Sequence, residues 1–262
     1  MLDAVVVVVA GIAAGTINAI VGSGSLITFP VLLALGYPPL VANISNNMGL
    51  LPGGITGSWG FRREVSRQRG ALTAMVPWSV LGGLSGALLL LVLPSSAFDA
   101  IVPVLVAVAV VLVALQPLLG RRATRRRETR AAIAVDPGAD GRRYGPVVAL
   151  ATLGCGVYGG YFGAAQGVLM MGLFGALLDD PLNELNALKN VLTTVVNTVA
   201  AVVFATVAFD RIDWAVALEI GIGTMLGGVI GSRIGRRLPP LALRIVVVVV
   251  GLVAFVRLLT AL

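Results

Sequence analysis

The sequence contains no histidine and a single cysteine, Cys155. The absence of histidine excludes histidine-ligated metal sites, Ser-His-Asp triads and histidine proton relays. One cysteine cannot form a disulfide within the chain, so cysteine use says nothing about the redox compartment. Because no pair of aspartates lies inside an apolar segment either, we expect no enzymatic activity, no cofactor and no metal site.

Charged residues are also scarce. They make up 12% of the 262 residues, whereas hydrophobic residues make up 58% and the mean hydropathy is +0.98. Soluble domains carry roughly 25% charged residues. This composition excludes a soluble enzyme and a disordered protein, and it predicts an integral membrane protein. The bias toward arginine, alanine and valine is compatible with a bacterial inner membrane.

The net charge of +7 comes from arginines that stand in short runs between apolar segments. Such runs are typical of loops retained on the cytoplasmic side of a membrane. We therefore expect the lipid bilayer as a partner and no binding of nucleic acid.

Ten apolar stretches are available to cross the bilayer, where a spanning helix needs about 20 residues. They are residues 4–22, 24–36, 40–60, 72–93, 98–120, 146–162, 163–178, 184–209, 214–234 and 241–262. The short stretches 24–36 and 163–178 follow glycine-rich breaks, so they are either short tilted helices or re-entrant hairpins. The predicted fold is an all-α polytopic membrane protein with about 8–10 transmembrane segments.

An internal repeat relates the two halves of the chain. An offset of 145 residues aligns matching residues: Gly11 with Gly156, Gly15 with Gly160, Gly22 with Gly167, Ala42 with Ala187, Gly82 with Gly227, Gly86 with Gly231 and Pro94 with Pro239. We predict a first membrane repeat over 1–120 and a second over 146–262. The residues between them, 121–145, include eight arginines and the turn-forming run Asp136-Pro137-Gly138, which predict a basic cytoplasmic linker.

The arginines indicate that the repeats have opposite orientations. One cluster, at 62–69, follows the third segment of the first half, whereas the cluster at 233–237 follows the fourth segment of the second half. Because basic clusters stay in the cytoplasm, this alternation indicates inverted topology. Five segments per half, with both termini outside, place every cluster in the cytoplasm. Four segments per half would leave residues 233–237 outside.

The glycine-rich start of each repeat has a specific pattern. The first repeat contains GTINAIVGSGSL over 15–26 and ANISNN over 42–47, and the second contains GVYGGYFG over 156–163 and LNALKN over 185–190. This duplicated pattern resembles the TauE/SafE family of membrane permeases, and the likeness covers nearly the whole chain. The second copy departs from the family in residues 163–167, GAAQG, which hold fewer glycines than is common there. The resemblance implies a transporter of sulfite, sulfonates or other organosulfur anions.

The breaks near the start of each repeat are the candidate substrate site. In inverted-repeat transporters the substrate lies near the midplane, where broken helices present N–H groups and positive dipole ends to an anion. The candidate substrate-binding residues at the breaks and on the neighbouring amides are Gly22, Ser23, Gly24, Ser25, Asn46, Asn47, Gln166 and Asn190. Alternatively, the glycines serve close helix packing and the amides join helices. Packing is the role that we assign to Gly82, Gly86, Gly227 and Gly231.

Two charged residues are unusual for their position. Lys189 is the single lysine among 19 basic residues and lies near the start of an apolar segment. Its ammonium group either binds an anionic substrate or extends to the headgroups. Glu219 is the only acidic residue that lies well inside a predicted segment. Its carboxylate either carries a coupling proton or reaches water near the outer interface.

The chain contains no P-loop of the type Gly-x-x-x-x-Gly-Lys-Ser/Thr. The sequence therefore predicts a secondary transporter of a small anion that works by alternating access between two inverted repeats. An anion channel and a non-transporting membrane scaffold are the alternatives. The sequence leaves the specific anion, the direction of transport, the coupling ion and the oligomeric state open.

Overall fold

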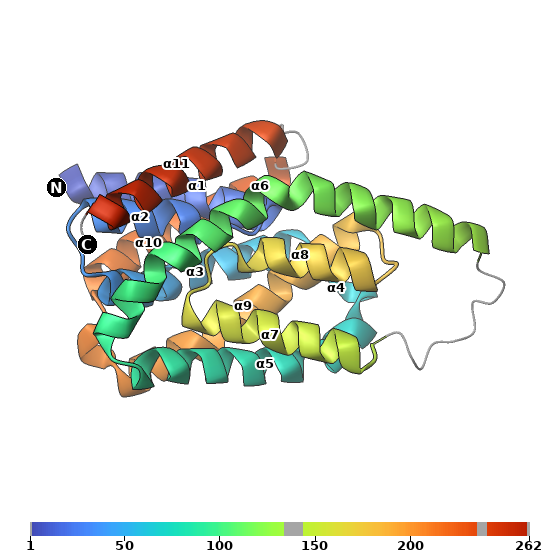
Figure 1. Ribbon diagram of the computed structural model, residues 1–262, viewed down its shortest axis with the longest axis horizontal. Coiled ribbons are helices and arrows are strands. Elements are labelled where there is room, and N and C mark those ends of the chain that lie inside the picture. The colour runs from blue at the N-terminus through green and yellow to red at the C-terminus, as the bar shows by residue number, and fades with distance from the viewer. Residues whose placement is uncertain (1, 134–143, 235–239, 261–262) are drawn as a thin grey trace.

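The computed structural model of the chain describes residues 2–133, 144–234 and 240–260, and helices make up nearly all of them (Figure 1). The first half contains α1 (Leu2–Ile20), α2 (Ser25–Ala34), α3 (Pro39–Gly60), α4 (Arg62–Arg67), α5 (Arg69–Val92) and α6 (Ser95–Ile133). The second half contains α7 (Pro146–Tyr161), α8 (Gln166–Leu177), α9 (Leu182–Val207), the 3-10 helix η2 (Phe209–Arg211), α10 (Trp214–Ile234) and α11 (Pro240–Thr260). Each of the ten predicted apolar stretches contains a helix in its described residues, and the short helix α4 is an addition to them.

Five helices in the described residues are long and apolar enough to cross a membrane: α1, α5, the part of α6 over Ser95–Gln116, α9 and α10. The helices α2, α7 and α8 are apolar but shorter. The helix α3 has 22 residues, but asparagines and glycines occupy much of it. The prediction of an all-α polytopic membrane protein is confirmed.

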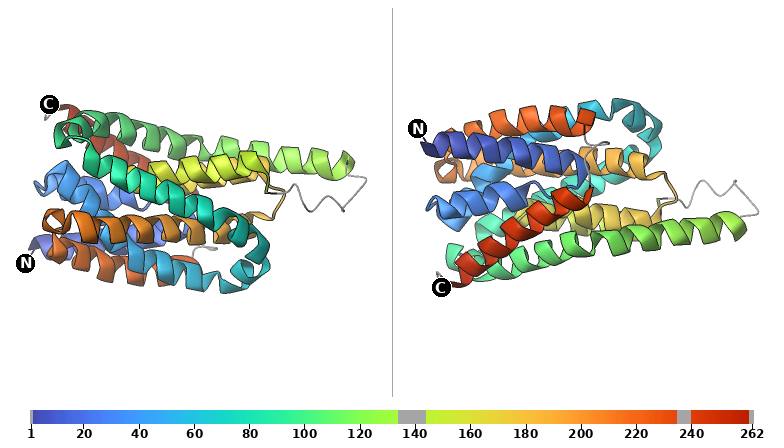
Figure 2. Two further views of the ribbon diagram at one scale, coloured as in Figure 1. Left: turned by 90° about the horizontal axis from the view of Figure 1, so that it is seen from below. Right: turned by 90° about the horizontal axis from the view of Figure 1, so that it is seen from above.

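The helices lie roughly along one axis, so the bundle has two ends. Both chain termini lie at one end, whereas α4, the end of α6 and the start of α7 lie at the opposite end (Figures 1 and 2). We call the end with the termini the outer end and the other the cytoplasmic end, because the arginines of α4 and Arg233 at the end of α10 mark the latter. Arg236 and Arg237 lie outside the described residues. This arrangement agrees with five segments per half, and the inverted relation of the halves stays a prediction.

The predicted linker differs from the structure in its first half. Helix α6 continues to Ile133, so residues 121–133 are helical and extend beyond the neighbouring helices (Figure 1). These residues are mostly arginine and alanine, which favour helix, and they contain neither proline nor glycine. The rest of the predicted linker, up to residue 143, lies outside the described residues.

Helices of the two halves pack tightly on one another. Helix α1 packs against α10, and α7 packs against α5. A Cβ atom at Gly227 would lie 2.2 Å from the carbonyl oxygen of Ile12, and one at Gly86 would lie 2.1 Å from that of Val157. Because backbones touch here, only glycine fits, which agrees with the packing role predicted for these glycines. The 145-residue offset that aligns α1 with α7 also aligns α10 with α5, so the two packed pairs are equivalent.

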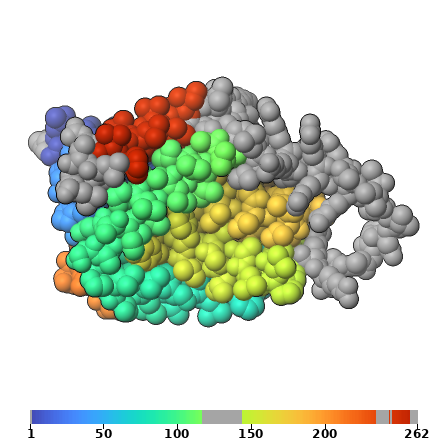
Figure 3. Space-filling model, in the orientation of Figure 1, coloured from blue at the N-terminus to red at the C-terminus, as the bar shows by residue number. Residues whose placement is uncertain are grey.

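The surface along the sides of the bundle also combines helices of both halves. On the face in Figure 3, α11 lies against α6, and α7 lies beside α5. In the described residues neither half forms a separate lobe, because helices of each half pack on helices of the other.

Candidate functional site

One break interrupts the helices near the start of each half. Residues 21–24 separate α1 from α2, and residues 162–165 separate α7 from α8. With 10 and 12 residues, α2 and α8 are each long enough for about half of the hydrocarbon thickness. Helix α2 turns back toward the outer end and α8 toward the cytoplasmic end (Figure 1). The prediction of short helices after glycine-rich breaks is confirmed, and each pair forms a helical hairpin.

The two breaks contact each other inside the protein. The N–H of Gly167 donates a hydrogen bond to the carbonyl oxygen of Gly22 over 3.1 Å. Gly22 has a φ of +86°, in the left-handed region that favours glycine. A Cβ atom on Gly22 would lie 2.6 Å from the Cα of Gly167. Two glycines are therefore needed for the hairpins to meet, and in this conformation one N–H of the α8 start is used by the first break.

Lys189 lies beside this contact. Its side chain comes from α9, is fully buried, and passes 3.0 Å from the place where a Cβ on Gly167 would be. Its Nζ donates a hydrogen bond to the carbonyl oxygen of Asn18 over 3.1 Å. The partial negative charge at the C-terminus of α1 favours a cation there. The interpretation that Lys189 extends to the headgroups is wrong, because the side chain points into the protein.

The charge of Lys189 has no carboxylate partner among the described residues, and its hydrogen bond goes to a backbone carbonyl. A buried ammonium group without a counter-ion is costly. The helix terminus offsets part of that cost, and a bound anion would offset more of it.

Asparagines on either side of Lys189 hold α9 against the end of α1. Both Asn186 and Asn190 donate from Nδ2 to the carbonyl oxygen of Ala19, each over 3.2 Å. Together with Lys189, they satisfy carbonyl groups that a helix end leaves without an intrahelical partner. Asn190 thus joins two helices, which was one of the two roles considered for it.

The amides on α3 have the same function for the second hairpin and for α2. Asn43 donates to the carbonyl oxygen of Tyr161 over 3.0 Å, at the end of α7. Asn46 accepts a hydrogen bond from the hydroxyl of Thr28 on α2. Asn46 is therefore occupied by a protein partner in this conformation.

Three of the predicted site residues carry buried atoms that have no hydrogen-bond partner. They are the hydroxyl of Ser23, the amide nitrogen of Gln166 and the amide oxygen of Asn47, in side chains that are 1%, 3% and 8% exposed. Buried polar groups are nearly always hydrogen-bonded, so each exception needs an explanation. Ser23 follows Gly22 and Gln166 precedes Gly167, so two unpartnered donors flank the glycine contact.

The remaining residues of the first break are also buried. The N–H of Gly24 donates to the side-chain oxygen of Asn18 over 3.5 Å, and Ser25 begins α2. The structure thus brings Gly22, Ser23, Gln166, Lys189 and Asn190 together around the ends of α1 and α8.

Glu219 lies apart from this group. Glu219 is half-buried in the second turn of α10. Gly231, 12 residues farther along α10, packs on Ala19 at the end of α1, beside the candidate site. Twelve helical residues correspond to about 18 Å. Burial, followed by the negative charges of Asp213 and Glu219, raises the pKa of Tyr37 in the α2–α3 connection. Glu219 therefore lies toward the outer end, and its role in coupling stays a prediction.

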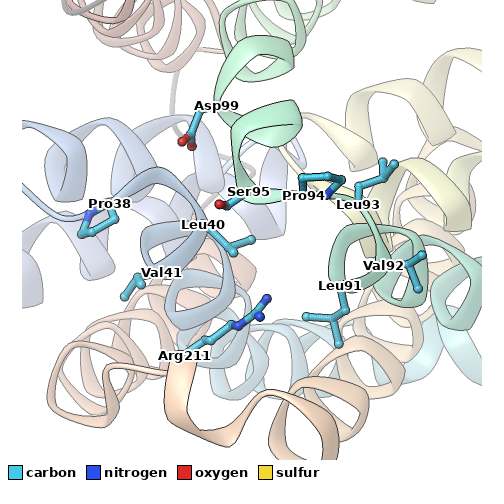
Figure 4. Close-up of a pocket in the computed structure, with 10 residues that line it drawn as sticks. All are labelled: Pro38, Leu40, Val41, Leu91, Val92, Leu93, Pro94, Ser95, Asp99 and Arg211. Carbon is cyan, nitrogen blue, oxygen red and sulfur yellow. The ribbon is translucent and has the colours of Figure 1, made fainter.

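A pocket at the outer end was not anticipated from the sequence. It has a volume of about 570 Å³, and Asp99 and Arg211 are the charged residues of its lining (Figure 4). Asp99 lies near the start of α6 and Arg211 in η2, and nothing in the sequence places the two side by side.

A polar cluster at the cytoplasmic end was also not anticipated. The Nε2 of Gln68, between α4 and α5, donates to carboxylate oxygens of Asp180 over 2.8 Å and of Glu184 over 2.6 Å. Arg67 adds a 3.8 Å ion pair with Glu184. The cluster joins the α4–α5 connection to the start of α9.

Comparisons with known proteins agree with this architecture. The chain is 30% identical over 255 residues to a probable membrane transporter protein, ORF9, of Sinorhizobium sp, with 96% of this chain and 90% of the relative covered. It is 28% identical over 247 residues to the probable membrane transporter protein YfcA of Escherichia coli K12, with 94% and 86% covered. No solved structure gives a significant match. The family model described as sulfite exporter TauE/SafE matches residues 7–258, and the chain belongs to this family.

Proposed function

We propose that this protein is a secondary transporter of a small anion in a bacterial inner membrane. The anion is sulfite, a sulfonate or another organosulfur anion, and transport occurs by alternating access between the two halves. The family description and the names of the relatives support a membrane transporter. The choice of an anion rests on the residues around Lys189.

The observation that carries the proposal is a buried cation next to buried donors that lack partners. Lys189 uses one of its three N–H groups on Asn18, and the hydroxyl of Ser23 and the amide nitrogen of Gln166 use none on protein. Sulfite and sulfonate groups carry oxygens that accept hydrogen bonds, and charge-assisted bonds to such oxygens are strong. An anion bound beside Lys189 would satisfy its charge, and we propose Ser23 and Gln166 as further donors to that anion.

Access to this site requires the breaks to separate. In the present conformation Gly167 donates to Gly22, so the two hairpins close on each other. The short helices α2 and α8 approach this contact from opposite ends of the bundle (Figure 1). Movement of one hairpin would expose the site to one side and movement of the other to the opposite side, as expected for inverted repeats.

Radioactive sulfite uptake into proteoliposomes tests the proposal. We expect saturable uptake, with counterflow when the vesicles are preloaded with unlabelled sulfite or a sulfonate. Ser23→Ala should reduce uptake, whereas Ser85→Ala on the exposed face of α5 serves as the matched control. Flux that never saturates would instead identify a channel. No flux of any sulfur oxyanion or sulfonate in either direction would overturn the transport proposal.

A further inference from the structure

The outer pocket lies between the starts of α3 and α6, the end of α5 and η2. Its lining is mostly apolar and consists of Pro38, Leu40, Val41, Leu91, Val92, Leu93, Pro94, Ser95, Asp99 and Arg211. Its volume of about 570 Å³ is in the range of small-molecule sites. Such sites combine apolar walls with a few polar groups that fix the orientation of the ligand.

The two charges of the pocket have opposite signs but do not pair. Figure 4 shows Asp99 and Arg211 on opposite sides of the pocket. No ion pair or hydrogen bond joins the two side chains, although both belong to described residues. Asp99 is half-buried and Arg211 is exposed. Because an exposed ion pair contributes little, nothing drives the long Arg211 side chain across the pocket to Asp99.

We infer that this pocket binds a small zwitterion. The oxyanion of the ligand binds the guanidinium of Arg211, its ammonium group binds the carboxylate of Asp99, and its alkyl part contacts Leu40 and Leu91. A singly charged anion would leave Asp99 without a partner and would be repelled by it. The same chemistry occurs in a free amino acid and in the headgroup of phosphatidylethanolamine, and the test below distinguishes these sources.

The pocket is separate from the Lys189 site. Leu40, which lines the pocket, is 9% exposed. About one turn farther along α3, Asn43 donates a hydrogen bond to the carbonyl oxygen of Tyr161. Beside it, the ring of Phe98 packs on that of Tyr161 with centroids 5.7 Å apart. These buried side chains lie between the pocket lining and the second break, and Lys189 is not among the residues that line the pocket. Ligand binding in the pocket therefore does not depend on Lys189 or on the proposed function.

Calorimetric titration of the detergent-purified protein tests the inference. The probes are 4-aminobutanoate and phosphoethanolamine, with butanoate and butylamine as singly charged controls. We expect both zwitterions to bind at least tenfold more tightly than the controls. Asp99→Asn and Arg211→Gln should each weaken zwitterion binding at least tenfold. Arg233→Gln, which alters an exposed cation at the cytoplasmic end, should leave it unchanged.

Nanodiscs that contain phosphatidylethanolamine and phosphatidylglycerol identify the source. Phosphatidylethanolamine that stays bound in native mass spectrometry, and is lost in Asp99→Asn, supports the inference with a lipid as ligand. Binding of 4-aminobutanoate without retained lipid supports it with a solute as ligand. Butanoate binding as tight as that of 4-aminobutanoate, with tighter binding in Asp99→Asn, would overturn it in favour of a simple anion entrance. No binding of any zwitterion and no retained lipid would also overturn it.

Discussion

Replacing Lys189 by methionine separates its role in anion binding from its role in stability. Methionine keeps a long unbranched side chain but removes the ammonium group and its hydrogen bond to the carbonyl of Asn18. Leaving that buried carbonyl without a donor costs about 1–3 kcal/mol. Removing a buried charge that has no carboxylate partner offsets this cost. We therefore expect the free energy of unfolding to change by less than about 2 kcal/mol.

The effect on anion affinity should be larger. A hydrogen bond to a charged group contributes about 1.5–3 kcal/mol, which corresponds to roughly a 10-fold to 150-fold change in the dissociation constant. Calorimetric titration of the purified protein with sulfite and with short alkyl sulfonates measures this change directly. Arg233→Met removes an exposed cation at the cytoplasmic end of α10 and is the matched control, because it alters net charge equally.

Unchanged sulfite affinity in a folded Lys189→Met protein would refute the assignment of Lys189 to the substrate site. If the methionine variant does not fold, Lys189→Gln provides a second test. Glutamine can still donate to Asn18 but carries no charge, so it should keep the fold and lose the affinity. A glutamine variant with wild-type affinity would contradict the reasoning in the same way.

Three further substitutions test the packing described above. Gly86→Ala should lower the free energy of unfolding by about 2 kcal/mol or more, and with it the apparent melting temperature, because its Cβ would lie 2.1 Å from a backbone oxygen of α7. Gly154→Ala is the control: a Cβ there meets nothing within 4 Å, so the substitution should be neutral or stabilising. Gly22→Ala and Gly36→Ala share the cost of a positive φ, but only the former meets backbone atoms, so only it should abolish both stability and transport. Gln68→Glu adds a third carboxylate to the cytoplasmic cluster, so thermal unfolding should occur at lower temperature at pH 7.5, with partial recovery near pH 4.5 as carboxylates become protonated.

The sequence was most informative about segments and breaks. Apolar stretches of bilayer length located the helices, because hydrophobic runs are a direct consequence of the lipid environment. Glycine clusters located both breaks to within a few residues, and the repeat offset paired them. The helical extension of α6 to Ile133 was missed, because arginine-rich composition indicates solvent exposure but does not distinguish a loop from an exposed helix.

Side-chain partners were less predictable. The position of Lys189 near the start of its segment allowed either an inward or an outward direction, and the choice depends on the end of α1, more than 160 residues away in the chain. Likewise, Asp99 and Arg211 line one pocket because four separate elements meet at the outer end. Neither juxtaposition has a local signal, since each depends on how distant helices pack.

The pairing of α1 with α10 has a consequence for the biosynthesis of the protein. Helix α1 is made first, but the glycine face that accepts it lies on α10, so residues 21–213 must be synthesised before the two can meet. At 5–20 residues per second, α1 waits roughly 10 to 40 s in the membrane without its partner. During that time its small-residue face is open to other helices or to a membrane chaperone. A truncated first half should therefore be a substrate for membrane proteases, whereas co-expression of the missing second half should protect it.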